Sequence, residues 1–248
     1  SINIREMFSQ TFFCVPIWSL LNRVVYNGLY YFCKPLFKIE EYKLERITSN
    51  IISSYHGLKC VKYVLQEYCE RDILFTYFIN INYNHILHFS ISYFIYDILN
   101  DIRIKNLTFT FLLHHSISII SGLYLYSVGL SQLYLVGLFV EISNLNLNIK
   151  DILDILEMKN IDFYLINGLL FSVTFFISRI VYAPIALKSA YILTNEVNHN
   201  YQESYDVKLI NYNIPLLLIV SFITLNIYWF HKIVKIIMNK YEKRYTIQ

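Results

Sequence analysis

The stretch Leu112–Lys150, LLHHSISIISGLYLYSVGLSQLYLVGLFVEISNLNLNIK, is almost wholly apolar and decides the fold class. The runs Phe109–Tyr126 and Leu133–Leu147 each approach the length of one membrane crossing, which needs roughly 20 residues. The stretch also carries two adjacent histidines, one glutamate and three asparagines. Polar groups at membrane depth are costly, so they normally face the protein interior and mark a functional path. His114, His115 and Glu141 are therefore the first functional candidates.

The composition of the whole chain also indicates a membrane protein. Of its 248 residues, 56% are hydrophobic and 16% are charged, whereas soluble domains have about 45–50% and about 25%. The net charge of +3 is too small to predict a nucleic-acid partner. The four cysteines have no CxxC spacing, which predicts structural thiols and neither a zinc site nor a disulfide framework.

Apolar run length and flanking charge predict seven spans. They are 8–33, 47–68, 84–100, 107–127, 130–148, 161–187 and 210–238. With the N-terminus outside, the cytosolic loops and tail hold thirteen Lys and Arg residues and the other side holds four. This asymmetry follows the positive-inside rule and places the C-terminus in the cytosol. Pro16 and Pro184 are expected to kink their helices.

Three segments outside the main spans have their own predicted roles. The first apolar stretch is expected to be a retained membrane anchor. Residues 149–159 alternate acidic and apolar side chains, which fits either a short amphipathic helix at the cytosolic interface or a solvated connector. Tyr191–Lys208 is polar and is predicted to be a non-cytosolic loop.

Helical spacing places several polar side chains on common faces. His56 and Lys59 share one face of the second span, and Glu141, Asn144 and Asn148 share one face of the fifth. Arg179 in the sixth span has no charge partner in its own helix. Because an unpaired buried charge is costly, we predict that Arg179 pairs with Glu141 or Asp97. The alternative is that these groups surround a cavity for a lipid headgroup.

The sequence also resembles the TLC-domain family, which includes ceramide synthases and translocon-associated proteins. The motifs that carry this resemblance follow one another along the chain: Ser54–Leu58, Ser92–Leu99, His114-His115, Glu141-Ile142-Ser143 with Asn148, Phe175–Ile180 and Leu225–Phe230. Together they resemble the TLC-domain-containing protein 4 (transmembrane protein 56) branch, from about Lys43 to Lys240. The resemblance implies an anchor and cytosolic loop at 1–42, a TLC domain at 43–240 and a cytosolic tail at 241–248.

The paired histidines have three interpretations. As metal ligands they would have to join His85 and His88, but di-iron membrane hydroxylases use more histidines than the seven in this chain, so we expect no metal. As buried, hydrogen-bonded side chains they need no further function. As catalytic groups, with Asp97 as a third candidate, they would resemble the acyl-transfer site of ceramide synthases. Those enzymes have a His-Asp pair and a further Asp in the next helix, and this chain has neither there.

The sequence therefore predicts an all-α multi-pass membrane protein with about seven transmembrane helices. The last six form a TLC-type bundle around a polar interior cavity. We expect it to bind or sense membrane lipid in the endoplasmic reticulum or another endomembrane and to act in lipid homeostasis, with sphingolipid as the lipid class that the resemblance implies. A homo-oligomer is compatible with this. The expected lipid-binding residues are His56, Lys59, Glu141, Asn144, Asn148 and Arg179. The alternatives are a lipid acyltransferase that uses His114, His115 and acyl-CoA, with no other cofactor, and a translocon-associated protein.

Overall fold

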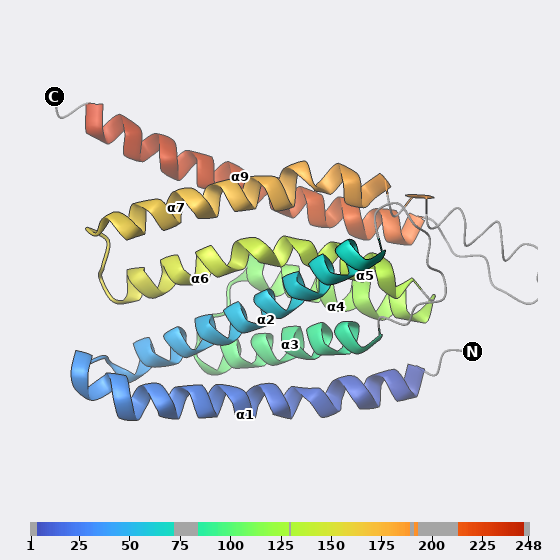
Figure 1. Ribbon diagram of the computed structural model, residues 1–248, viewed down its shortest axis with the longest axis horizontal. Helices are drawn as coiled ribbons and strands as arrows, with labels where there is room; N and C mark the ends of the chain where they lie inside the picture. The colour runs from blue at the N-terminus through green and yellow to red at the C-terminus, as the bar shows by residue number, and fades with distance from the viewer. Residues whose placement is uncertain (1–3, 72–83, 129, 189–190, 193–212, 246–248) are drawn as a thin grey trace, which may run out of the picture.

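The computed structural model describes residues 4–71, 84–128, 130–188, 191–192 and 213–245, and within these ranges it contains helices and no strand. This confirms the all-α prediction. The elements are α1 (Ile4–Phe37), α2 (Glu41–Arg71), α3 (Asn84–Arg103), α4 (Phe109–Ser127), α5 (Ser131–Gly137), the 3₁₀-helix η1 (Leu138–Glu141), α6 (Ile142–Ile155), α7 (Asp162–Phe175), the π-helix η2 (Phe176–Val181) and α9 (Asn213–Tyr245) (Figure 1).

Three segments of the described chain are long and apolar enough to cross a membrane. They are Phe109–Ser127, Asp162–Lys188 and Leu217–Met238, and they coincide with the fourth, sixth and seventh predicted spans. The other predicted spans fall on α1, α2, α3 and the continuous run of α5, η1 and α6.

The helices pack side by side in one elongated bundle (Figure 1). In that view α1 lies along one edge and α7 and α9 lie along the opposite edge, with the remaining helices between them. The helix pairs with extensive contact are α2 with α6, α1 with α3, α6 with α7, and α3 with α4.

Helix α1, which covers the predicted N-terminal anchor, packs as part of this bundle. The Trp18 side chain is only 4% exposed and belongs to the apolar core. Its indole Nε1 donates a hydrogen bond to Ser92 Oγ on α3 at 3.1 Å, and Thr11 Oγ1 lies 2.9 Å from His88 Nδ1. A large aromatic side chain contributes much buried area, so α3 and α1 hold each other in place. Helix α1 also remains continuous through Pro16.

The predicted interfacial helix at 149–159 is instead the second half of α6, which ends at Ile155. The reason is a set of polar contacts with α2. Arg46 Nη2 lies 3.0 Å from Asp151 Oδ1, and Asn50 Nδ2 donates to Asp151 Oδ2 at 2.7 Å. Lys150 and Asp154 form an (i, i+4) pair at 2.6 Å. The acidic side chains therefore bind neighbouring basic groups and keep this segment on the axis of α6.

The charged residues gather at one end of the bundle. The α1–α2, α3–α4 and α6–α7 connections lie at the same end as the C-terminus, and the N-terminus lies at the other (Figure 1). Ion pairs here include Lys34 with Glu41, Arg103 with Glu45, and Lys43 with Glu157. Termini at opposite ends agree with an odd number of crossings.

The loop predicted at Tyr191–Lys208 lies mostly outside the described residues. Helix α9 continues to Tyr245, beyond the predicted start of the tail at residue 241.

Candidate functional site

The polar side chains predicted from the sequence form a buried layer inside the bundle. His56 comes from α2, Asp97 from α3, His114 and His115 from α4, Glu141 from η1, and Arg179 from η2, and each is buried. Because burial removes these side chains from bulk water, their hydrogen bonds must come from one another, from a ligand or from enclosed water. The partners of each group therefore indicate what the layer can do.

His115 pairs with Asp97 across the α3–α4 contact. Its Nε2 lies 3.1 Å from Asp97 Oδ2, and its Nδ1 lies 3.1 Å from the carbonyl oxygen of Phe111. The hydroxyl of Tyr93 donates to the same Asp97 oxygen at 2.8 Å. The sequence lacks the downstream His-Asp of the synthases, but the fold supplies an orienting carboxylate from the preceding helix. Both nitrogens of His115 are engaged by protein atoms in this conformation.

His114 faces a different part of the molecule. Successive residues of an α-helix are rotated by about 100°, so the adjacent imidazoles reach different neighbours, although their centroids lie 5.2 Å apart in an edge-to-face contact. The His114 ring packs against Phe222 and Trp229 of α9, with ring centroids 5.1 and 5.3 Å apart. Its Nδ1 is buried and has no hydrogen-bond partner. The two histidines therefore do not act as one symmetric pair.

Arg179 does not form the direct ion pair that we predicted. Within the described residues, no salt bridge joins it to Glu141 or Asp97, and the prediction of direct contact is wrong. The guanidinium instead donates to three uncharged oxygens: Ser143 Oγ at 2.9 Å, Asn226 Oδ1 at 3.1 Å and Asn144 Oδ1 at 2.8 Å. The amide of Asn144 in turn donates to Glu141 Oε2 at 2.7 Å. One amide thus connects the two charges, because its oxygen accepts while its nitrogen donates.

Two irregular helical turns, η1 and η2, position the side chains of the Arg179–Asn144–Glu141 network. Pro184 has no N–H to give to the preceding turn, and just before it η2 widens into a π-helix that brings Ser178 and Arg179 to the interior. Opposite, η1 tightens into a 3₁₀-helix that ends at Glu141. Gly57 of α2 lies so close to η1 that an added Cβ would be 3.1 Å from the Glu141 carbonyl oxygen. Such backbone is tolerated at membrane depth where protein buries it or a cavity adjoins it.

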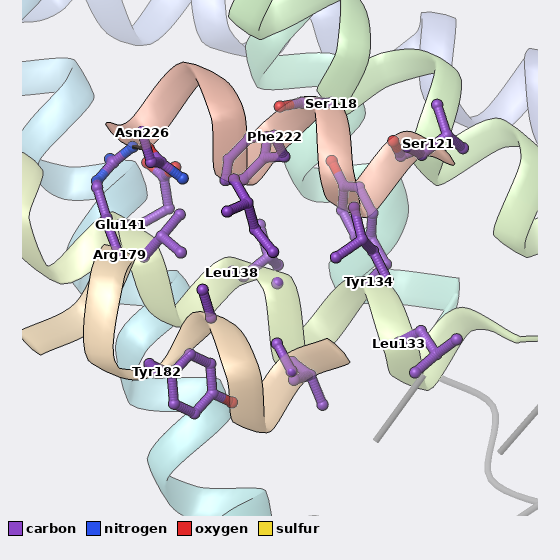
Figure 2. Close-up of a pocket in the computed structure, with 18 of the residues that line it drawn as sticks. Ser118, Ser121, Leu133, Tyr134, Leu138, Glu141, Arg179, Tyr182, Phe222 and Asn226 are labelled. Atoms are coloured by element: carbon purple, nitrogen blue, oxygen red, sulfur yellow. Dashed lines mark hydrogen bonds between the residues drawn. The ribbon is translucent and has the colours of Figure 1, made fainter. Parts of the chain in front are cut away.

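A mostly apolar cavity of about 130 Å³ adjoins Arg179 and Glu141. Its walls come from α3, α4, α5, η1, η2 with the residues that follow it to Ala186, and α9. Figure 2 shows Arg179, Glu141 and Asn226 together at one end, Leu138 and Phe222 in the middle, and Leu133, Tyr134 and Ser121 toward the other end. One end of the cavity is therefore charged while most of its length is apolar.

A second cavity of about 290 Å³ is lined largely by polar residues. Its lining includes Asp97, Asp101 and Asn148, together with Arg46 and Asp151 from the charged end of the bundle. Asn148 also donates to Ser54 Oγ at 3.1 Å. The Asp97–His115 pair therefore borders a polar space that is continuous with the charged end.

Two predicted lipid-binding residues lie apart from both cavities. His56 is fully buried, stacks on Tyr93 with centroids 3.9 Å apart, and has its Nδ1 3.8 Å from Glu141 Oε2. The Lys59 ammonium lies 5.7 Å from the centre of the Tyr55 ring and lines neither cavity. His56 therefore lies beside Glu141 without lining a cavity. Lys59 contacts neither Glu141 nor the cavity linings that the structure describes.

Asn226 and Tyr134 are site residues that sequence reasoning missed. Asn226 is the single asparagine in the apolar run from Pro215 to Phe230, and that isolation was a usable signal. Tyr134 is one of 23 tyrosines, so nothing in the sequence singles it out.

In the described part of the chain, no three His, Cys, Asp or Glu side chains converge on a point that could hold a metal ion. His88 is engaged with Thr11 on α1 instead.

A comparison with known protein families matches residues 13–235 to the TLC domain. The chain belongs to the TLC-domain family. The match begins within α1, which agrees with the packing of Trp18 in the core, and it extends to α9. A comparison with individual curated proteins gave no match. TLC-domain membership makes the chain a helical membrane protein with a lipid-related function.

Proposed function

We propose that this TLC-domain protein binds a membrane lipid inside its bundle, with the acyl chain in the apolar cavity and the headgroup at Arg179 and Glu141. The observation that carries the proposal is the polarity of that cavity, which is charged at one end and apolar along its length. Binding sites of this kind combine an apolar lining with a few polar groups that fix the orientation of the ligand.

The size of the cavity limits what enters it. Its volume of about 130 Å³ is of the order of the roughly 150 Å³ apolar cavities that hold a benzene-sized molecule. The enclosed part therefore accommodates a segment of one chain and not a whole two-chain lipid. The Arg179 and Glu141 charges cancel, which favours a headgroup without net charge, such as an amide, an ester or a zwitterion.

Photocrosslinking tests this proposal. Purified protein in lipid nanodiscs is incubated with a monoacylglycerol whose chain carries a diazirine, and the labelled peptides are identified by mass spectrometry. We expect labelling of η1 and α9 near Leu138 and Phe222. Ala183 lines the cavity, so Ala183→Phe should fill the cavity with a phenyl ring and abolish the labelling.

The matched control is Leu169→Phe, which adds an aromatic ring at a position on α7 that is 66% exposed to the surroundings of the bundle. This variant should label like the wild type. Equal labelling of the Ala183→Phe and wild-type proteins at η1 and α9 would show that the chain lies elsewhere.

The His115–Asp97 pair supports a second candidate, transfer of an acyl group from acyl-CoA to a lipid hydroxyl or amine. His115 would take the proton of the attacking group at Nδ1, once that atom leaves the carbonyl oxygen of Phe111, while Asp97 holds Nε2. The attacking oxygen or nitrogen would form the ester or amide as the thioester bond breaks, and the proton would leave with the coenzyme A thiol. The polar cavity beside Asp97 offers a route from the charged end. Radiolabelled acyl-CoA with purified protein tests this: turnover that is lost in His115→Ala would establish it, and absence of turnover in the wild type would leave lipid binding alone.

The finer assignment follows from the resemblance and the charge distribution. We place the chain in the TLC-domain-containing protein 4 branch, in the endoplasmic reticulum or another endomembrane, with the C-terminus in the cytosol and a role in lipid homeostasis. Sphingolipids are the lipid class that the relation to ceramide synthases favours, and self-association is compatible with the exposed apolar faces.

A further inference from the structure

Three hydroxyl groups gather along the apolar cavity away from Arg179. Ser118 and Ser121 come from α4 and Tyr134 comes from α5, and all three line the cavity. Figure 2 places them together, with Leu138 and Phe222 between them and the charged end. The Tyr134 ring packs directly on α4, because a Cβ built on Gly122 would lie 3.0 Å from Tyr134 Cε2.

The Tyr134 hydroxyl has no hydrogen-bond partner in the protein. Its oxygen is buried, and the residue is only 6% exposed. A phenol placed in an apolar environment without a partner is unfavourable, and phenylalanine would fill the same space without that cost. Ser118 donates its own proton to the carbonyl oxygen of His114 at 3.0 Å, so its oxygen lone pairs remain available as acceptors. We call Ser118, Ser121 and Tyr134 the hydroxyl patch. It offers a free hydrogen-bond donor, the Tyr134 hydroxyl, and at least one free acceptor, Ser118 Oγ.

From this arrangement we infer that the lipid bound in the cavity carries a hydroxyl group on its acyl chain. The Tyr134 hydroxyl donates to the oxygen of that group, and the group donates its proton to Ser118 Oγ. A hydroxyl is the chain substituent that satisfies both, since it is donor and acceptor at once. The inference rests on the proposed function, because it specifies the ligand of the same cavity.

Competition binding tests the inference. Full-length protein in nanodiscs is labelled with the photoreactive monoacylglycerol, and unlabelled monoacylglycerols compete: one with a plain octadecanoyl chain, a set with a hydroxyl at successive mid-chain positions, and the matching ketones. One pair of added hydrogen bonds in an apolar cavity should make the best hydroxyl isomer bind about three- to tenfold more tightly than the plain chain. The ketone accepts from Tyr134 but donates nothing, so its affinity should fall between them.

Tyr134→Phe should remove this preference, so that the plain and hydroxylated chains compete equally in the variant. The variant is expected to fold, because it deletes a hydroxyl that has no partner. Tyr96→Phe is the matched control: it also deletes a buried phenol hydroxyl, but Tyr96 lines neither cavity. That control should keep the wild-type preference. Ser118→Ala provides a second variant, which should reduce the advantage of the hydroxyl isomer and leave the ketone unchanged.

The outcomes separate this inference from the proposed function. If plain and hydroxylated chains compete equally at every position, or if Tyr134→Phe retains the preference, the Tyr134 hydroxyl does not recognise a chain hydroxyl and the inference is wrong while lipid binding stands. If no monoacylglycerol competes with the probe, the proposed function itself is wrong.

Discussion

Arg179 and Glu141 form a buried network that depends on a single amide. Neither side chain exceeds 3% exposure, and Asn144 is hydrogen-bonded to both. Because each charge offsets the other in a medium of low dielectric constant, removing one leaves the other uncompensated. Asn144 also keeps the two charges from closing into a direct pair, so donors of the guanidinium stay near the cavity.

A double-mutant cycle checks this network. Glu141→Gln and Arg179→Gln should each lower the free energy of unfolding in detergent by about 3 kcal/mol. The double variant should recover at least about 1 kcal/mol of the summed loss. Lys159→Gln, at an exposed ion pair with Asp154, should change stability little. Strictly additive losses would mean that Glu141 and Arg179 are not coupled.

The two adjacent histidines should respond differently to the same replacement. His114→Phe puts an apolar ring beside Phe222 and Trp229, and we expect little change in thermal unfolding. His115→Phe removes the partner of buried Asp97 and should cost about 3 kcal/mol. Adding Asp97→Asn to His115→Phe should restore part of that loss. Equal effects of the two His→Phe variants would contradict the different surroundings of the two rings.

At the scale of the elements, the site depends on where α2, η1 and η2 approach one another. Gly57 allows α2 to lie against the backbone of η1. The π-helical turn of η2 and the 3₁₀ turn of η1 bring Arg179 and Glu141 to the same end of the cavity. Local departures from the regular α-helix often occur at functional sites, and here they lie directly beside the polar layer.

Glycine replacements test the close approach. Gly57→Ala sets a methyl group 3.1 Å from a backbone oxygen that cannot rotate away, so α2 or η1 must shift. We expect a loss of about 1–3 kcal/mol in the free energy of unfolding and weaker labelling by the photoreactive lipid. Gly168→Ala on α7 meets no atom within 4 Å and should be neutral or stabilising by up to about 1 kcal/mol. Similar effects of the two variants would show that the contact at Gly57 does not constrain the fold.

At the scale of the whole molecule, the bundle separates a charged end from a largely apolar body. Three basic residues near the helix ends there, Lys34, Arg103 and Lys43, are paired with acidic groups. The positive-inside rule favours the cytosol for that end. The polar cavity beside Asp97 would then open toward the cytosol, and the apolar cavity would lie at membrane depth.

Topology mapping checks this orientation. Asn106-Leu107-Thr108 is the only N-glycosylation sequon in the chain, and it lies in the α3–α4 connection at the charged end. We expect it to remain unglycosylated, and we expect a cysteine introduced within Lys240–Gln248 to react with an impermeant reagent only from the cytosolic side. A cysteine within Tyr191–Lys208 should react from the opposite side. A glycan on Asn106 would show that the charged end faces away from the cytosol, opposite to the predicted orientation.

The sequence by itself determined the helical membrane class and most of the members of the polar layer. Run length and helical period locate α4, α7 and α9, because a helix that crosses a membrane must be apolar over its length. The same reasoning selected Asp97, His115, Glu141, Asn144 and Arg179, since polar residues in such runs face the interior.

Only the tertiary structure decided how these side chains combine. It joined His115 to Asp97, turned His114 toward α9, and placed Asn144 between Glu141 and Arg179. It also showed that 149–159 largely continues α6 and that Tyr134 borders the cavity. The physical reason is that contacts between helices depend on the rotation and offset of each helix. Irregular turns such as η1 and η2 change both, and apolar periodicity does not encode where they occur.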